Sequence, residues 1–347
     1  MRKKHFLFAS VLALLCGSST LHAQDFKLTS SGYFKNQGVD VMAFDDIYPE
    51  GHQGGVCIIM NGHRVATNGD IRLEATPGQW QPVPKQLDRK LGDNSITATL
   101  CYPDSSRHLT GFNPMIYPDL HLIYTVNVES KGKNIEVTVD LDRPIPQEFI
   151  GKVGFNLEFF PGSLFGKPWI MDGQSGIFPQ QPNSPLMTTQ PNYLHTGNYH
   201  DGKKSLADMN KLIGKGYSPI VADDIISEPY AKGTKFTSRP DDPYNKVTIE
   251  SLSGDLQLFD GRMNHNNGWF VLRSNIKPGV TKGAVKWIIT PNVVADWMYQ
   301  PVIQTSQIGY HPTQDKEAVI EMDIRDNRKE TAQIIRIDAD GEKVVKN

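Results

Sequence analysis

Residues 120–141 read LHLIYTVNVESKGKNIEVTVDL, and apolar residues alternate with mostly polar ones on both sides of a central polar turn. The apolar positions are Leu120, Leu122, Tyr124, Val126 and Val128 before the turn, and Ile135, Val137, Val139 and Leu141 after it. Successive side chains of a strand point to opposite faces of a sheet. The period of two therefore predicts an antiparallel hairpin with one buried face and one wetter face.

Shorter signals of the same kind recur along the chain. Strand-like apolar runs occupy residues 56–60, 247–250, 256–259, 269–272 and 284–289. Asn61-Gly62 and Asn68-Gly69 tolerate the positive φ of tight turns, so each pair predicts a hairpin turn. Many short strands with abundant Gly and Pro predict an all-β protein, built as a large β-sandwich. Residues 205–213 are a modest helix candidate within a long irregular stretch, residues 190–245.

The first 23 residues have the pattern of a secretory signal peptide. Basic residues at positions 2–4 precede an apolar run at 6–15, and small residues lead to a cleavage point after Ala23. The expected location is periplasmic or extracellular. A lipid anchor on Cys16 is the alternative, but the large Leu15 before it disfavours lipoprotein processing.

The composition of the remaining chain excludes some partners. Without residues 1–23 it has 33 basic and 38 acidic residues, a formal net charge of −5, so it offers no basic field for nucleic acid. No later stretch is long and apolar enough to span a bilayer. Cys57 and Cys101 can form a bridge in an oxidising compartment, but their strand-like surroundings favour buried free thiols. Neither has neighbours at metal-ligand spacing, so we expect no metal and no cofactor.

A second unit is expected to begin near Pro301. Residues 24–300 then form the sandwich, and residues 301–347 form the opening strands of an Ig-like β-sandwich. A complete domain of that kind needs about 100 residues, so we expect this module to be incomplete within the chain.

A family resemblance enters at this boundary. Residues 304–312 read QTSQIGYHP and residues 316–319 read KEAV. They resemble the opening strand of the Ig-like domain that precedes the catalytic barrel in family 9 glycoside hydrolases, where the pattern is Asn-Gln-Val-Gly-Tyr, then Pro, then Lys-x-Ala. Ser306 and Ile308 depart from it. Upstream segments resemble the N-terminal β region of some secreted family 9 proteins; they are residues 68–74, 77–80, 111–114, 154–160 and 176–179.

The resemblance implies an ancillary, non-catalytic role in polysaccharide degradation. Family 9 enzymes invert the glycosidic bond with two carboxyl groups roughly 6.5–9.5 Å apart, held in an (α/α) barrel that carries an Asp-Ala-Gly-Asp motif. The nearest match here, residues 338–341, reads Asp-Ala-Asp-Gly. No catalytic residue is carried over, and the barrel is expected elsewhere in a full-length parent.

Aromatic residues are the candidates for contact with a polysaccharide or oligosaccharide. Trp80 and Trp169 lie beside Pro, Gly and Gln, and Tyr193 and Tyr199 lie in the irregular stretch. Aromatic faces suit the apolar faces of pyranose rings, although large aromatic residues of sandwiches more often belong to the core.

Two other functions stay open from the sequence. One is a stand-alone exported glycan-binding protein. The other is a self-contained hydrolase or lyase, which would require Glu158, His195 and neighbouring polar groups to converge in one cleft.

Overall fold

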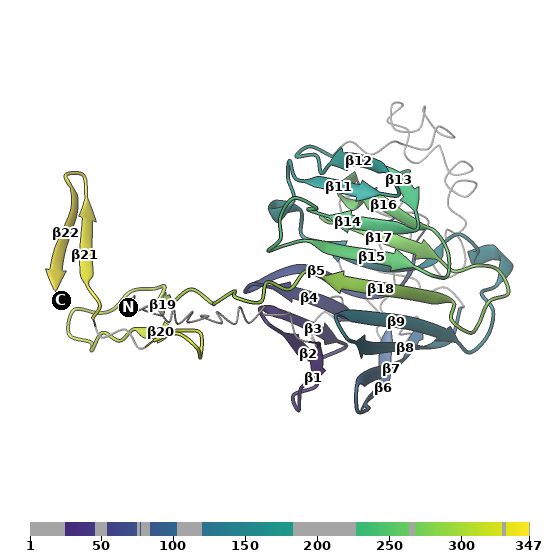
Figure 1. Cartoon of the computed structure of the whole chain (residues 1–347), viewed down its shortest axis with the longest axis horizontal. Coiled ribbons are helices and arrows are strands. Elements are labelled where there is room, and N and C mark those ends of the chain that lie inside the picture. The colour runs from purple at the N-terminus through teal and green to yellow at the C-terminus, as the bar shows by residue number, and fades with distance from the viewer. Residues whose placement is uncertain are drawn as a thin grey trace, which may run out of the picture.

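The chain is a two-layer β-sandwich followed by two small hairpins (Figure 1). The computed structural model describes residues 25–45, 54–74, 77, 84–102, 120–182, 227–263, 268–327 and 331–346. Among these residues each layer is a nine-stranded sheet, and the strand pairings between them are antiparallel. The all-β sandwich expected from the sequence is therefore confirmed.

The first layer, sheet A, runs in the order β1-β2-β3-β4-β5-β10-β17-β16-β13. Its strands are β1 (Lys27–Leu28), β2 (Phe34–Asn36), β3 (Val39–Ala43), β4 (Val56–Met60), β5 (His63–Leu73), β10 (Val153–Phe159), β17 (Phe270–Asn275), β16 (Leu256–Asp260) and β13 (Ala231–Gly233).

The second layer, sheet B, runs in the order β12-β11-β14-β15-β18-β9-β8-β7-β6. Its strands are β12 (Gln174–Ile177), β11 (Pro168–Met171), β14 (Lys235–Ser238), β15 (Val247–Ser251), β18 (Val285–Pro291), β9 (Asn134–Leu141), β8 (Leu122–Lys131), β7 (Ser95–Tyr102) and β6 (Lys85–Leu91). Within the described part of the sandwich there are also three short 3₁₀ turns, η1 (Gln147–Phe149), η2 (Pro161–Ser163) and η3 (Gly261–Met263).

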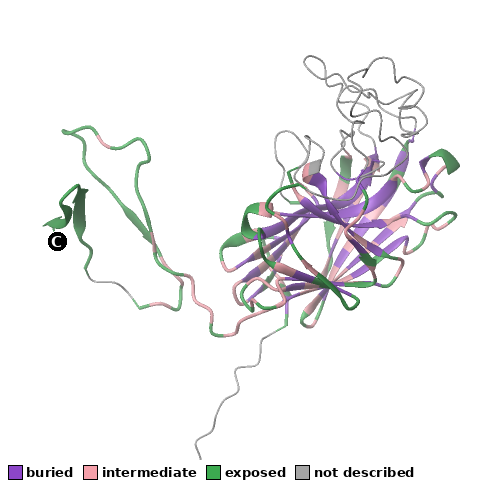
Figure 2. Cartoon of the chain, turned by 90° about the horizontal axis from the view of Figure 1, so that it is seen from above, coloured by how far each residue is buried: buried purple, intermediate pink, exposed green. Residues whose placement is uncertain are grey.

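Aromatic side chains join the two sheets across the core. Phe155 of β10 meets Trp287 of β18 edge to face, with ring centroids 5.0 Å apart. The indole Nε1 of Trp287 donates a hydrogen bond of 3.0 Å to Ser274 Oγ of β17, so its one polar atom is satisfied inside the core. Figure 2 shows the buried residues concentrated in the two layers.

The hairpin expected at residues 120–141 is confirmed as β8 and β9. Their apolar positions are buried and the intervening positions are partly exposed, as the alternation predicts. Asn61-Gly62 forms the turn between β4 and β5, with φ of 52° and 82°. Cys57 is buried and Cys101 is partly exposed, and the two do not form a disulfide.

The prediction of a second hairpin turn, at Asn68-Gly69, is wrong. Both residues lie inside the eleven-residue strand β5, where the pairing shifts register against β4 and against β10. Asn68 has a φ of 56°, so its tolerance of positive φ serves a β-bulge instead of a turn. Gly69 faces Val56 so closely that a Cβ would lie 2.5 Å from the Val56 Cβ, which requires glycine there.

Residues beyond 300 form two separate two-stranded sheets. β19 (Val302–Gln304) pairs with β20 (Val319–Glu321), and β21 (Ile334–Asp338) pairs with β22 (Gly341–Lys346). In Figure 2 this part is almost entirely exposed, whereas the sandwich is not. Within the described residues, no helix has the length and apolar character needed to cross a membrane. The helix expected at 205–213 lies outside them.

Candidate functional site

The structure gives Trp169 a packing position. It lies in β11, and only 7% of its surface is exposed. Its indole is so close to Gly176 of β12 that a Cβ there would lie 2.5 Å from the ring. Trp80, Tyr193 and Tyr199, the other expected sugar-stacking residues, lie outside the described residues, as does His195.

The most unusual feature of the sandwich is a group of buried polar side chains on three neighbouring strands of sheet A. We call it the polar cluster; it consists of Asn68, Asp70, Arg72 and Glu74 of β5 and its end, Asn156 and Glu158 of β10, and Arg273 of β17. None of these residues is more than 6% exposed. Buried charges are costly unless they are paired, so each needs an account.

Strand register brings the cluster together. β10 pairs with β5 on one side and with β17 on the other, placing Asn156 between Asp70 and Arg273. Gly154 of β10 leaves room for the guanidinium group, because a Cβ there would lie 2.7 Å from Arg273 Nε.

Side chains also satisfy the open edge of β5. The pairing of β4 with β5 ends at Gly69, so residues 70–73 lack a strand partner on that side. The backbone N–H of Leu73 donates to Tyr102 Oη at 3.2 Å, and Ile71 N–H donates to Asp70 Oδ1 at 2.7 Å. Arg72 donates to the Ile71 carbonyl at 3.2 Å. These contacts replace the missing ladder bonds, since buried backbone groups need partners.

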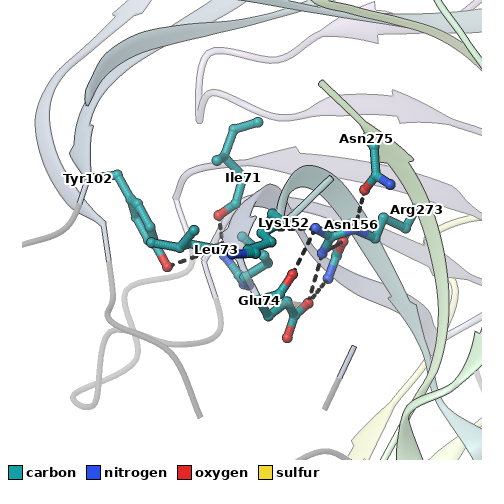
Figure 3. Close-up of polar contacts among 9 residues, drawn as sticks. Ile71, Leu73, Glu74, Tyr102, Lys152, Asn156, Arg273 and Asn275 are labelled. Carbon is teal, nitrogen blue, oxygen red and sulfur yellow. Dashed lines mark hydrogen bonds and ion pairs between the residues drawn. The ribbon is translucent and has the colours of Figure 1, made fainter. Parts of the chain in front are cut away.

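Arg273 is fully occupied by bonds within the protein (Figure 3). Its Nη1 donates to Glu74 Oε1 at 3.1 Å and Asn156 Oδ1 at 3.2 Å; its Nη2 donates to the backbone oxygens of Glu74 at 3.2 Å and Lys152 at 2.8 Å. Its Nε donates to Asn275 Oδ1 at 2.7 Å. A guanidinium has five N–H donors, and these bonds use all of them. Arg273 therefore fastens the end of β5 to β10 and keeps no donor for a ligand.

Glu74 is less completely satisfied. Its Oε1 accepts from Arg273 and, at 2.6 Å, from Asn156 Nδ2, whereas its Oε2 is buried without a hydrogen-bond partner. Burial raises the pKa of Glu74 to about 7, although the Arg273 charge and the Asn156 bond oppose that rise. This carboxyl group can therefore exchange a proton near neutral pH.

Asp70 behaves similarly on the other side of the cluster. Its Oδ1 accepts from Tyr124 Oη at 2.8 Å, and Arg72 Nη1 lies 3.6 Å from its Oδ2. Burial raises the pKa of Asp70 to about 6, against the opposing effect of Arg72 and of the Tyr124 bond.

The bulge at Asn68 contributes the remaining part of the cluster. Asn68 Nδ2 donates to Glu158 Oε2 at 2.6 Å, while Asn68 Oδ1 and Thr67 Oγ1 are buried without a hydrogen-bond partner. Glu158 therefore lies close to neighbouring polar groups, as a self-contained hydrolase or lyase would require. Within the described residues this group lies inside the sheet and not in an open cleft, because Glu158 is 3% exposed.

A second buried pair fastens an edge of the sandwich. Arg262 donates from Nε and Nη2 to the two oxygens of Asp260, each at 2.8 Å, and also to the carbonyls of Pro179 at 2.7 Å and Gln180 at 2.9 Å. Tyr230 Oη donates to Asp260 Oδ2 at 3.0 Å.

Sequence reasoning missed the polar cluster, although a signal was present. Residues 70–74 read DIRLE, in which charges of both signs alternate with apolar residues. Such a face is usually solvated, and the buried partner of Glu74 is Arg273, distant in the sequence. Among the described residues, no group of three or more His, Cys, Asp or Glu side chains is arranged to hold a metal ion.

Comparisons with known proteins do not identify a family for this chain. No family model and no curated protein matches the chain. Among solved structures, the Slr1438 protein from Synechocystis sp. PCC 6803 is 11% identical, with a TM-score of 0.32, over 84% of this chain and 100% of that one. A galactose mutarotase related enzyme from Lactobacillus acidophilus is 9% identical, with a TM-score of 0.33, over 74% and 96%. Heparan sulfate lyase HepC from Pedobacter heparinus is 10% identical, with a TM-score of 0.28, over 91% of this chain and 41% of that one. Likenesses this weak carry no argument about function.

Proposed function

We propose that this chain is the ancillary, substrate-presenting part of an exported polysaccharide-degrading enzyme that resembles family 9 glycoside hydrolases. In this proposal residues 24–300 are the N-terminal sandwich, and residues 301–347 belong to the Ig-like module that braces a catalytic barrel. The catalytic carboxyl groups would be supplied by that barrel, and residues 1–23 would direct export.

The observation that carries the proposal is the exposed apolar surface of β19–β22. Ile303 is 60% exposed, Val319 65% and Ile337 76%. Strands with apolar side chains this exposed are typical of surfaces that another element covers. The same region holds residues 304–312 and 316–319, which carry one part of the family resemblance.

The loop between β19 and β20 is nevertheless ordered by its own side chains. Tyr310 Oη accepts from Ser306 N–H at 3.1 Å and donates to the Glu317 carbonyl. One hydroxyl thus closes the loop that contains the Gln-Ile-Gly-Tyr sequence, which gives this tyrosine of the motif a structural role.

The experiment compares binding with turnover. Purified chain should be retarded in affinity gels that contain soluble β-glucans, and it should release no reducing sugar from them, because inverting hydrolysis needs an acid and a base on opposite sides of the bond. Absence of binding to every neutral polysaccharide tested would contradict the substrate-presenting role.

A second function, catalysis inside the sandwich, is favoured by one observation. Glu74 has a pKa of about 7 and an oxygen without a partner, and Glu158 belongs to the same cluster. If the chain released reducing sugar and Glu158→Gln abolished that release while the protein kept its melting temperature, this second function would replace the first.

A further inference from the structure

Three aromatic residues gather where the chain leaves the sandwich. Trp297 and Tyr299 follow β18, and Tyr244 lies on the connection between β14 and β15. They surround two tight turns of sheet A, one at Gly38 between β2 and β3 and one at Asn61-Gly62 between β4 and β5.

The two glycines let the rings lie directly on the turns. Gly38 has a φ of 65°, and a Cβ there would lie 2.7 Å from the Trp297 ring. Gly62 has a φ of 82°, and its Cβ would lie 3.2 Å from the Tyr299 ring. The Trp297 and Tyr299 rings meet edge to face, with centroids 6.2 Å apart. The turns therefore fix both rings at the surface, where each stays partly exposed.

Tyr244 is held in place by its backbone while its side chain stays accessible. Its N–H donates to Asp242 Oδ1 at 2.8 Å, and its carbonyl accepts from Asn61 Nδ2 at 2.6 Å. Tyr244 is 48% exposed. Bonds to both polar groups of its backbone restrict the segment that carries this exposed ring, which reduces the conformational freedom lost when a ligand binds.

Three neutral amide side chains bond to the backbone of these aromatic residues or of their neighbour Pro243. Gln37 Nε2 donates to the Trp297 carbonyl at 2.7 Å, Asn292 Nδ2 donates to the Pro243 carbonyl at 2.7 Å, and Asn61 holds Tyr244 as described. Each bond uses one amide N–H, and in the described contacts the side-chain oxygens of these three residues accept no hydrogen bond. Each amide thus keeps donor and acceptor capacity for a ligand.

We propose that Tyr244, Trp297 and Tyr299, with Gln37, Asn61 and Asn292, form a binding platform for a neutral oligosaccharide. The C–H face of a pyranose stacks on aromatic rings, and its hydroxyl groups match neutral amides, which both donate and accept. The proposal rests on the substrate-presenting function above and gives it a site. Trp80, Tyr193 and Tyr199, the expected sugar-stacking residues outside the described part of the chain, remain separate candidates.

The same residues also anchor the connection to residues 301–346. Arg325 donates to the Trp297 carbonyl, and Tyr299 N–H donates to Asp323 Oδ2 at 3.0 Å. Replacing Trp297 or Tyr299 would leave these backbone bonds in place, but it would remove a ring that packs on Gly38 or Gly62 next to them. Tyr244 has no part in these bonds, which makes it the residue to test.

The test is calorimetric titration of the full chain with gluco-, xylo- and manno-oligosaccharides joined by β-1,4 bonds. Tyr244→Ala should lower the affinity for the best of these by about tenfold, the size of one lost stacking contact of about 1.4 kcal/mol. Tyr244→Phe should stay within about twofold, because it keeps the ring. Tyr33→Ala is the matched control, since Tyr33 is a partly exposed tyrosine on the turn before β2.

The outcomes separate the two proposals. Weakened binding in Tyr244→Ala, with Tyr33→Ala unchanged, supports the platform. If the unaltered chain binds and Tyr244→Ala binds equally well, the platform is wrong. The substrate-presenting role is not contradicted by that result. Absence of binding to all three oligosaccharide classes, and to the polysaccharides above, overturns both.

Discussion

The sandwich and the hairpins after residue 300 each contain an arginine paired with a carboxylate, and the two pairs differ in surroundings. Arg273 and Glu74 lie 3.1 Å apart, and their side chains are 2% and 1% exposed. Arg325 and Asp323 lie 2.9 Å apart, and their side chains are 39% and 10% exposed. Burial raises the pKa of Glu74, whereas the hydrogen bond from Arg325 and those from backbone N–H groups lower the pKa of Asp323. Similar geometry thus produces opposite electrostatic outcomes, because water screens only one pair.

The sharpest way to test this contrast is to remove each arginine. Arg273→Met should lower the free energy of unfolding by about 3–5 kcal/mol, because it leaves a buried carboxylate without its cation. Arg325→Met should change stability little, since a solvent-exposed pair is weak. Urea denaturation followed by tryptophan fluorescence measures both. The double variant Arg273→Met with Glu74→Gln should recover part of the loss; equal effects of the two single variants would contradict the contrast.

A second test uses pH. Glu74 holds its proton more tightly in the folded protein, where its pKa is about 7, than in the unfolded chain, where it is near 4.5. Its contribution to stability is therefore present below pH 4.5 and is lost as the pH rises through about 7. Raising the pH from 5 to 8 should destabilise the unaltered chain relative to Glu74→Gln by up to about 3 kcal/mol.

Asp323 provides the opposite control for that test. Because its pKa is lowered, Asp323 contributes stability at pH values above the ordinary pKa of an aspartate. This contribution is lost only as the pH falls below that value. Asp323→Asn should consequently leave the response between pH 5 and pH 8 unchanged. Thermal unfolding curves of both variants at the two pH values are the measurement, and a Glu74→Gln response parallel to that of the unaltered chain would refute the assignment.

The smallest effect is expected from removing the hairpins themselves. Limited proteolysis should cut residues 301–346 first, because they are exposed, and leave a resistant core that ends near Tyr299. That core should unfold within about 2 °C of the full chain, since the strands beyond 300 pair only with one another. Protection of β21 equal to that of β8 in hydrogen exchange would show instead that the two regions fold as one unit.

The sequence was most informative where structure follows from local alternation. The β8–β9 hairpin and the Asn61-Gly62 turn depend on neighbouring residues, so their pattern sufficed. Asn68-Gly69 carried the same local signal but became a bulge, because β5 continues to pair with β10 beyond it. The local sequence at residues 68–69 does not indicate whether a third strand, here β10, pairs with β5.

The polar cluster could not be predicted from local sequence either. Alternating charges in residues 70–74 predict a solvated face, and only the packed sheet reveals that Arg273 and Asn156 lie beside them. Trp169 illustrates the converse, since its Pro and Gly neighbours made it a candidate for sugar contact although its side chain is buried in β11.

The Asp260–Arg262 pair has a consequence for how this sequence can change. Through Pro179, Gln180 and Tyr230 it holds the chain on both sides of residues 183–226. Because residues 179–180 and Tyr230 are secured by this pair, a change in the number of residues between them leaves both anchor points in place. Homologous genes should therefore tolerate insertions and deletions in this interval while retaining Asp260 and Arg262, so that new surfaces could evolve there without redesign of the sandwich.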